Sequence, residues 1–377
     1  MSKEIIVLSI VSLFWLYYLL FLLRIRIGLS RLSVPHETVT QPSVSVIVAA
    51  HNEEMTIRIC LLSLLAQSYP KEKIDIIVVD DESSDHTAER VRTLAASHST
   101  VRLVSMVSKG TRLTSRKSEA IAEGIKSSKA DLIFTTDADC VTPEGWIESM
   151  LSYFDDKTVL VAGPVGESTG INLSARLGNI EFLGLIASAA GLIGIDSPIF
   201  CNGANLAYRR SAFLSAGGFG SSPSPCDDEL LLQRIHTRRL GSIKYSVDSR
   251  SIVWTEPKQS LSSLLSQRVR WASKRGHYEQ KRILLTLITL YFSFLGLLVL
   301  TIGAFFESSF RLPAIMLLAG KATADYFVLR KSASLFHQRF SFTEFIVAEI
   351  FHVPYIVVAA LLGQVITPRW KGTRSVS

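Results

Sequence analysis

Two apolar runs that end in acidic residues decide the fold: Val44–Glu54, VSVIVAAHNEE, and Ile76–Ser84, IIVVDDESS. Each begins with a nearly continuous apolar stretch instead of an alternation of apolar and polar residues. Strands that are buried on both faces have this pattern, as in parallel sheets that helices cover on both sides. The two runs therefore predict an α/β fold in which both strands lie inside the sheet.

Strand and helix patterns alternate outward from these two runs. We expect strands over 44–50, 74–79, 101–107 and 131–136, and helices over 53–67, 87–97 and 115–127. This alternation predicts a mostly parallel, doubly wound sheet. Ligands of such sheets bind beyond the carboxyl ends of the strands. Asp80 with Asp81, and Asp137 with Asp139, follow two of the predicted strands, so the pattern places a site at that edge.

Long apolar segments lie at both ends of the chain. Ile5–Leu23 and Ile283–Phe306 have no charge, Phe345–Ile366 carries Glu349 and His352, and Leu312–Leu329 carries Lys321 and Asp325. A helix that crosses the hydrocarbon core needs about 20 mostly apolar residues. We therefore expect an N-terminal transmembrane anchor at 1–32, a soluble domain at 43–280, and a membrane region at 281–377 with two or three transmembrane helices.

Basic residues predict the orientation of these segments. Arg24, Arg26 and Arg31 follow the first segment, and the positive-inside rule then places the soluble domain in the cytoplasm of an integral plasma-membrane protein. The basic C-terminal tail also favours the inside, so one of the last three segments should be re-entrant or interfacial. Leu312–Leu329 is the candidate, because Lys321 and Asp325 are costly at mid-bilayer.

Composition limits the partners. The formal charge of +7 suits anionic partners such as lipid headgroups and nucleotide phosphates. No basic stripe is interleaved with aromatic residues, so nucleic acid is not expected. The four cysteines form no CxxC pair, which argues against a zinc or thioredoxin-like site.

Two of the acidic motifs have both a chemical and a plain structural interpretation. Asp80 and Asp81 could accept hydrogen bonds from a nucleoside, or they could form a turn or cap for the next helix. Asp137 and Asp139, in TTDADC, could bind a divalent cation through carboxylate oxygens and so neutralise a diphosphate, or they could form a turn.

Two later motifs are open in the same way. The acids of Cys226-Asp227-Asp228-Glu229 could cap the helix that follows, or they could include a general base. Gln267-Arg268-Val269-Arg270-Trp271 could be a basic helix at a membrane surface, or it could combine a phosphate-binding arginine with an indole that stacks on a sugar.

Together, VSVIVAAHNEE, VVDDESSD, TTDADC, CDDE and QRVRW resemble glycosyltransferase family 2, the family of the cellulose, chitin and hyaluronan synthases, over roughly residues 44–271. The resemblance implies an A-type glycosyltransferase nucleotide-binding domain flanked by membrane helices, with Mg²⁺ or Mn²⁺ as cofactor. His51 and the Asp-Asp pair at 227–228 depart from the commoner residues. The membrane region is also smaller than in large synthases, which puts a full polymer channel in doubt.

The resemblance also implies a role for each motif residue. Asp228 would be the general base, and Asp137 and Asp139 would bind the metal. The implied donor-binding residues are Glu53, Asp80, Asp81, Lys117, Asp137 and Arg270. The implied acceptor-binding residues are Asn202, Asn205, Gln267 and Trp271.

The expected activity is inverting transfer of a sugar from a nucleotide-sugar, expected to be a UDP-sugar, to a growing polysaccharide or a lipid-linked saccharide. The alternative is an inactive transferase-like subunit of an assembly or export system. The expected partners are the donor, the acceptor and the lipid bilayer, with a second copy of the chain or an export partner left open. Glu349 and His352 have two interpretations: they mark a function in the membrane, or they have a structural role in which they pair with Lys321 or arginine residues or lie at an interface.

Overall fold

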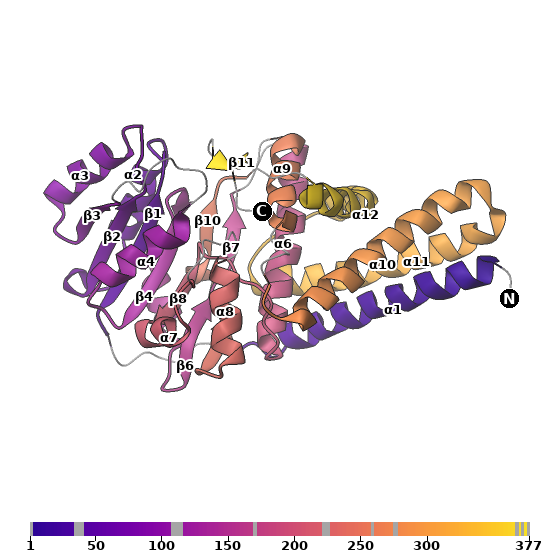
Figure 1. The fold of residues 1–377 in the computed structure, drawn as a ribbon, viewed down its shortest axis with the longest axis horizontal. Helices are drawn as coiled ribbons and strands as arrows, with labels where there is room; N and C mark the ends of the chain where they lie inside the picture. The colour runs from indigo at the N-terminus through magenta and orange to yellow at the C-terminus, as the bar shows by residue number, and fades with distance from the viewer. Residues whose placement is uncertain are drawn as a thin grey trace.

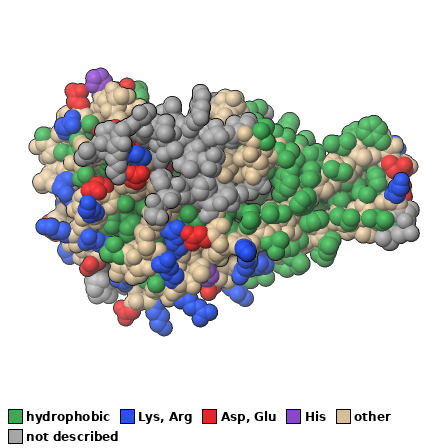
Figure 2. Space-filling model, in the orientation of Figure 1, with side chains coloured by type: hydrophobic (Ala, Val, Ile, Leu, Met, Phe, Trp, Pro, Cys, Tyr) green, Lys and Arg blue, Asp and Glu red, His purple; other side chains and the backbone are tan. Residues whose placement is uncertain are grey.

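The computed structural model describes residues 3–33, 41–106, 116–168, 172–220, 227–257, 260–273, 278–365, 369–370 and 373–374. An α/β domain lies at one end and a stalk of long helices at the other, and α1 begins at the free end of this stalk (Figure 1). Figure 2 shows hydrophobic side chains along the stalk, and Lys and Arg side chains on the domain and at its junction with the stalk.

A seven-stranded sheet forms the centre of the α/β domain, in the order β3-β2-β1-β4-β8-β6-β9. Its strands are β1 (Val44–Ala50), β2 (Ile74–Asp80), β3 (Val101–Ser105), β4 (Leu132–Asp137), β6 (Thr158–Ala162), β8 (Leu206–Arg209) and β9 (Ser242–Tyr245). The strands β3, β2, β1 and β4 run parallel, as the sequence predicts. The sheet is nevertheless mixed, because β8 pairs antiparallel with β4 and β6.

Shorter strands complete the sheet structure. A three-stranded sheet contains β5 (Cys140–Val141), β10 (Val253–Thr255) and β7 (Val165–Glu167), in that order. Near the C-terminus, β11 (Arg369–Trp370) pairs with β12 (Thr373–Arg374).

Helices between the strands cover the sheet. They are α2 (Ile57–Leu65), α3 (Thr87–Ser97), α4 (Lys117–Ser127), α5 (Trp146–Leu151), α7 (Arg210–Ser215) and α8 (Asp227–Thr237), with 3₁₀ turns at Lys71–Lys73 and Ser249–Ser251. The continuous apolar strands are explained by this cover: all but one residue of β1 is buried.

Five of the described helices are long and apolar enough to span a membrane. Four of them match the segments expected from the sequence: α1 (Lys3–Leu29), α10 (Lys281–Phe306), α11 (Arg311–Leu335) and α12 (Phe342–Val365). The fifth, α6 (Leu173–Gly194), was missed, because Arg176 and Glu181 interrupt its apolar run. The prediction of apolar spanning helices is therefore confirmed, with one more than expected. The helix α9 (Leu261–Ala272) packs against the long helices α12 and α6, and a third 3₁₀ turn, Ser308–Phe310, joins α10 to α11.

The stalk consists of α1, α10 and α11, which run side by side, whereas α12 is seen nearly end-on and crosses them (Figure 1). The predicted re-entrant or interfacial segment, Leu312–Leu329, lies in α11, which is aligned with the stalk. The helix that departs from the stalk direction is α12. Lys321 pairs with Asp325 within α11 and with Glu349 of α12, so the protein itself offsets the charges on which that prediction was based.

A crossing at glycines joins the stalk to the α/β domain. A Cβ atom added to Gly28 of α1 would lie 1.7 Å from the carbonyl oxygen of Gly191 in α6. A Cβ atom on Gly194 would lie 2.2 Å from the carbonyl oxygen of Gly28. Only residues without side chains allow the two backbones to approach this closely, so these glycines fix where α1 leaves the domain.

Candidate functional site

The acidic residues predicted at strand ends do share one edge of the sheet. In the parallel register, Ala50 of β1 lies opposite Asp80 of β2, and Ala49 lies opposite Asp137 of β4. Asp80 and Asp137 are therefore on either side of β1 at its carboxyl end. This is the edge at which ligands of open α/β sheets bind.

Hydrogen bonds join the loops that follow β1 and β2. Asn52 has a left-handed backbone (φ 53°), and its side-chain oxygen accepts a hydrogen bond from the Ser84 amide at 2.8 Å. The His51 ring nitrogen lies 2.8 Å from the Asp81 carbonyl oxygen. The backbone N–H of Glu53 donates to the Thr87 hydroxyl at 2.8 Å. Glu53, Asp80 and Asp81 are thus held in one structural unit.

Arg116 is a site residue that sequence reasoning missed. Its guanidinium lies 3.1 Å from the Asp81 carboxylate and 3.3 Å from that of Glu82, and the Arg116 side chain is only 10% exposed. One carboxylate oxygen of the neighbouring Asp80 is buried and has no hydrogen-bond partner among the described residues. Arg116 belongs to no distinguishing motif beyond its position next to Lys117, so no sequence pattern signals its role.

Lys117 is the cation that faces the acids at the end of β4. Its ammonium donates to the Asp137 carboxylate at 2.5 Å. Burial alone would lower the pKa of Lys117, but Asp137, Asp228 and Asp139 outweigh it and raise the pKa. Lys117 therefore stays charged, held by its bond to Asp137 and favoured by the negative charges of Asp228 and Asp139.

Asp228 reaches this group from the first turn of α8. A Cβ atom added to Gly203 would lie 1.9 Å from Asp228 Oδ2, so the carboxylate packs directly on the backbone of Gly203. The Asn202 side chain shapes the same loop, because its oxygen accepts a hydrogen bond from the Ala204 amide at 3.1 Å. Gly203 thus leaves the space that the Asp228 carboxylate occupies.

The role predicted for Asn205 does not fit the structure. Asn205 is fully buried, and its amide nitrogen donates to the carbonyl oxygens of Pro164 and Ser251, each at 2.7 Å. Its side-chain oxygen accepts from the Trp146 indole at 2.9 Å. Its hydrogen-bonding groups are thus engaged inside the domain, where they support the loop instead of facing an acceptor. The sequence could not distinguish this role from that of Asn202.

The helix α9 brings Arg270 to the same acids. Burial lowers the pKa of Arg270, and the charges of Asp137 and Asp139 partly oppose that effect. An arginine retains its charge at neutral pH in any case. Lys117, Asp137, Asp139, Asp228 and Arg270 consequently form one cluster, which we call the strand-edge cluster.

Trp271 packs where α9 meets α6. The Arg268 guanidinium lies 4.2 Å from the centre of the Trp271 ring, and Phe182 packs 6.3 Å from it. Arg268, whose role the sequence left unassigned, is buried and bonds to Glu181 of α6 at 2.8 Å. The Arg268 guanidinium also donates a hydrogen bond to Gln267 Oε1 at 3.2 Å. One face of Trp271 is therefore covered by Arg268, which makes the indole part of the helix junction.

The residues of the strand-edge cluster fit a divalent cation. Asp137 and Asp139 carry carboxylate oxygens, the donors that Mg²⁺ and Mn²⁺ prefer, while Asp228 adds a third negative charge to the cluster. Three carboxylates exceed the two cations, Lys117 and Arg270, so the cluster has a formal negative charge before any ligand binds. Cys60 and Cys140 are buried beside it, and burial raises the pKa of both thiols.

A second group of acids lies among the long helices. The ammonium of Lys321 bonds to Asp325 at 2.7 Å, to the Glu349 carboxylate, and to the His352 ring at 3.0 Å. Tyr18 of α1 donates to Asp325 at 2.5 Å. We call these five residues the intramembrane cluster. Of the two interpretations of Glu349 and His352, the structure supports pairing with Lys321. Asp325, Glu349 and His352 are spaced for a metal ion, but the Lys321 ammonium contacts all three.

Comparisons with known proteins agree with the fold. Residues 45–215 match the model of Glycosyl transferase family 2. The chain is 30% identical over 278 residues to a probable glycosyltransferase, YdaM, of Bacillus subtilis, covering 67% of this chain and 62% of YdaM. It is 27% identical to a poly-beta-1,6-N-acetyl-D-glucosamine synthase of Staphylococcus epidermidis, covering 62% of this chain and 54% of the synthase. The alignments thus span somewhat over half of each relative.

A solved structure extends the likeness to the helices. The mannosyltransferase PcManGT from Pyrobaculum calidifontis, in complex with GDP-Man and Mn²⁺, superposes with a TM-score of 0.61. The match covers 97% of this chain and 98% of that protein at 18% identity. At this identity the likeness concerns the fold, and it includes the arrangement of the α/β domain with its long helices.

Proposed function

Residues 45–215 form a glycosyl transferase family 2 domain, and from this premise we propose that the chain transfers a sugar from a nucleotide-sugar donor, with inversion, to a saccharide or lipid-linked acceptor. The observation that carries the proposal is the convergence of Lys117, Asp137, Asp139, Asp228 and Arg270 at the carboxyl edge of the sheet. Carboxylates and positively charged side chains together at this edge suit a donor that carries a diphosphate and an acceptor that carries a reacting hydroxyl.

The donor is proposed to lie across the ends of β2, β1 and β4. Asp80, with its buried unpartnered oxygen, and Asp81, fixed by Arg116, would receive the nucleoside. Arg270 and Lys117 would contact the diphosphate, since cationic side chains form strong charge-assisted hydrogen bonds with phosphate oxygens. The bond from Lys117 to Asp137 keeps that ammonium at the edge where the phosphates would lie. The nucleoside base and the sugar are left open by these contacts.

Asp137 and Asp139 would hold a divalent cation. When bound, such an ion neutralises charge on the departing diphosphate. The complex of PcManGT with GDP-Man and Mn²⁺ supports metal use in a protein of the same fold. The carboxylate excess of the cluster supports it in this chain.

Asp228 would act as the general base. It would take the proton from the acceptor hydroxyl, whose oxygen forms a bond to the anomeric carbon as the bond to the diphosphate breaks. Attack from the face opposite the leaving group inverts the configuration, so an α-linked donor gives a β-linked product. The tight contact with Gly203 supports this role, because it fixes one direction for the carboxylate.

The chain is proposed to lie at the cytoplasmic face of the bilayer. With α1, α10 and α11 as the crossings, an outside N-terminus would place both the domain and the C-terminal tail inside. The arginines at the C-terminal end of α1 and just after it favour that side, and so does the basic tail. The helix α12, which crosses the stalk (Figure 1), would then lie near the membrane plane. The basic tail that follows α12 would therefore stay on the cytoplasmic side.

A screen of nucleotide sugars against the full chain in detergent or nanodiscs tests the proposal. Released nucleoside diphosphate is measured with Mn²⁺, with Mg²⁺ and with excess chelator, beside Asp139→Asn prepared in parallel. We expect slow, cation-dependent release from one donor, and none from Asp139→Asn. Release by neither protein from any donor, with or without saccharide acceptors, would support an inactive subunit instead.

A further inference from the structure

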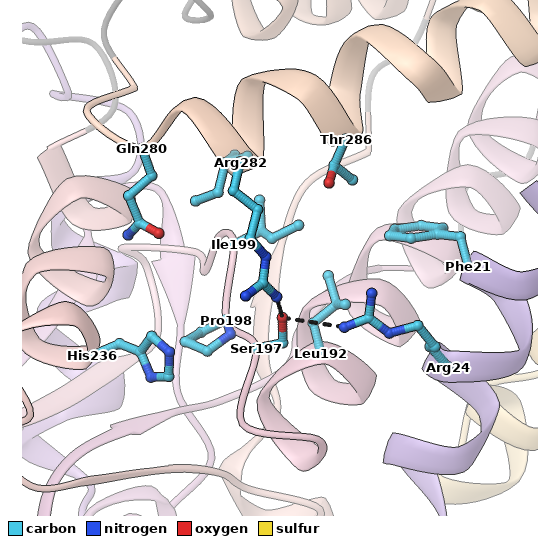
Figure 3. Close-up of a pocket in the computed structure, with 11 residues that line it drawn as sticks. Phe21, Arg24, Leu192, Ser197, Pro198, Ile199, His236, Gln280, Arg282 and Thr286 are labelled. Atoms are coloured by element: carbon cyan, nitrogen blue, oxygen red, sulfur yellow. Dashed lines mark hydrogen bonds between the residues drawn. The ribbon is translucent and has the colours of Figure 1, made fainter. Parts of the chain in front are cut away.

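A small pocket lies at the junction of α1, α10 and the domain, and the catalytic proposal does not use it. Figure 3 shows Arg24 of α1 and Arg282 of α10 pointing from opposite sides toward Ser197, in the loop that follows α6. The pocket encloses about 410 Å³, including its open mouth.

Two guanidinium groups share one neutral acceptor in this pocket. The Ser197 hydroxyl oxygen accepts from Arg282 at 2.7 Å and from Arg24 at 3.4 Å. Within the described part of the chain, neither arginine has a carboxylate within ion-pairing distance. The carboxylate of Asp196 at the rim contacts His236, at 3.4 Å. Each guanidinium has five N–H donors, so the pair can bind an anion without breaking an existing ion pair.

The remaining walls of the pocket combine apolar side chains with the polar side chains of His236, Gln280 and Thr286. Phe21, Leu192, Pro198 and Ile283 line it beside the two arginines. A free phosphate ion would gain nothing from these apolar side chains. An anionic headgroup attached to hydrocarbon chains would contact both the cations and the apolar side chains, and the surface of the stalk continues from the pocket with exposed Leu20 and Leu23.

The height of the pocket along the stalk fits a headgroup. The helix α1 runs about 1.5 Å per residue, so Arg24 lies roughly 28 Å from Ile5 along the axis. The hydrocarbon core of a bilayer is about 30 Å thick. Arg24 and Arg282, at the domain ends of α1 and α10, therefore lie at one boundary of the apolar stalk.

We propose that Arg24, Arg282 and Ser197 bind the phosphate of an anionic glycerophospholipid and so anchor the domain to the bilayer surface. This inference rests on the proposed membrane placement and not on sugar transfer. The site is separate from the strand-edge cluster. His236, at the pocket, is eight residues from Asp228 on the same helix, about 12 Å along its axis. Basic pockets between membrane helices are suited to such headgroups.

Native mass spectrometry of the full chain in detergent tests the proposal. The probes are a phosphatidylglycerol, the matching phosphatidylcholine, and glycerol phosphate without acyl chains. The variant is Arg24→Gln with Arg282→Gln, and the control is Lys281→Gln, which removes an exposed charge beside the pocket. Arg282→Gln alone is a second variant, for use if the double change prevents folding.

We expect the wild type and Lys281→Gln to prefer phosphatidylglycerol over phosphatidylcholine. Each arginine near a bilayer surface contributes about a fivefold change in binding, so the double variant should lose about 25-fold and the single variant about fivefold. An equal loss of phosphatidylglycerol binding in Lys281→Gln would overturn the proposal, because it would show that the lipid responds only to the general positive charge of this surface. Retained preference in the variants, or glycerol phosphate binding as tightly as the lipid, would overturn the proposal. Because the readout is lipid binding, failure of the donor screen leaves this test intact.

Discussion

The strand-edge cluster and the intramembrane cluster contain the same kinds of groups, carboxylates around a lysine, but they differ in how completely the protein encloses the lysine. The three N–H donors of Lys321 have three partners, Asp325, Glu349 and His352, and the Lys321 side chain has no exposed surface. The Lys117 side chain is 35% exposed and that of its partner Asp137 is 33% exposed. Lys321 is closed off by the protein, whereas Lys117 faces a place that solvent or a ligand reaches.

We therefore infer that carboxylates of the same type have two different roles in this chain, one in stability and one in ligand binding. Buried charges are tolerated only when their hydrogen-bonding groups are satisfied, and the intramembrane cluster achieves this with side chains from α1, α11 and α12. The strand-edge cluster retains an excess of carboxylates at an accessible edge. We therefore expect substitutions in the first to change stability, and substitutions in the second to change turnover.

Asp228→Asn should have the largest effect on turnover. The amide keeps the shape of the side chain on Gly203 but cannot accept the proton, and a general base contributes about 10²–10⁴-fold. We expect a loss in that range at saturating donor, with unchanged donor affinity and thermal stability. Sugar transfer measured against donor concentration checks this. A variant with normal turnover would remove Asp228 from the chemistry.

Lys321→Met should have the largest effect on stability. It leaves the carboxylates of Asp325 and Glu349 buried without their cation, and breaking a buried pair costs about 3–5 kcal/mol. Thermal unfolding in detergent checks this, with Lys331→Met on the same helix as the control. We expect a clear loss for Lys321→Met, near-normal stability for the control, and normal turnover per folded molecule. A Lys321→Met variant that is stable but inactive would contradict the assignment of the intramembrane cluster to stability alone.

Gly203→Ala should show how precisely Asp228 must be placed. The added methyl group would lie 1.9 Å from Asp228 Oδ2, so the carboxylate has to move. A displacement of about 1 Å can cost about 10²-fold in rate. In the control Gly184→Ala, the methyl group would meet Leu329 at an ordinary 3.7 Å. Initial rates of the two variants should differ by about that factor, and equal rates would argue against a fixed carboxylate.

Asp227→Asn should have the smallest effect. Asp227 begins α8, where a negative charge is favourable by about 0.3–1 kcal/mol. We expect a loss of unfolding free energy of that size, with turnover close to that of the wild type. If Asp227→Asn lost more turnover than Asp228→Asn, the proposed base would be the wrong one of the two acids.

The sequence predicted the features that depend on local pattern. The bounds of β1 and α3 were predicted without error, and those of β2 and β4 within one residue, because continuous apolar runs and amphipathic helices leave a direct trace in the sequence. The common edge of Asp80 and Asp137 followed from the parallel sheet. The resemblance to glycosyltransferase family 2 is likewise confirmed by the family match over residues 45–215.

Features that depend on tertiary packing were not predictable. Asn202 and Asn205 lie in one short motif, yet only Asn205 is enclosed by Trp146, Pro164 and Ser251. The direction of α12 depends on its packing against α9 and α6, which no periodicity records. Arg116 pairs with Asp81 across 35 positions of sequence, so its role emerges only when β2 and α4 are placed side by side.

Binding of nucleoside diphosphates tests the central claim most directly, because it needs neither the correct sugar nor the acceptor. Isothermal titration of the full chain with UDP and with GDP, in Mn²⁺ and in excess chelator, should include Asp139→Asn and Asp228→Asn. We expect cation-dependent binding of at least one nucleotide. This binding should be lost in Asp139→Asn and retained in Asp228→Asn. Equal affinity with and without the cation, or equal binding by Asp139→Asn, would contradict the assignment of the strand-edge cluster as the metal and diphosphate site.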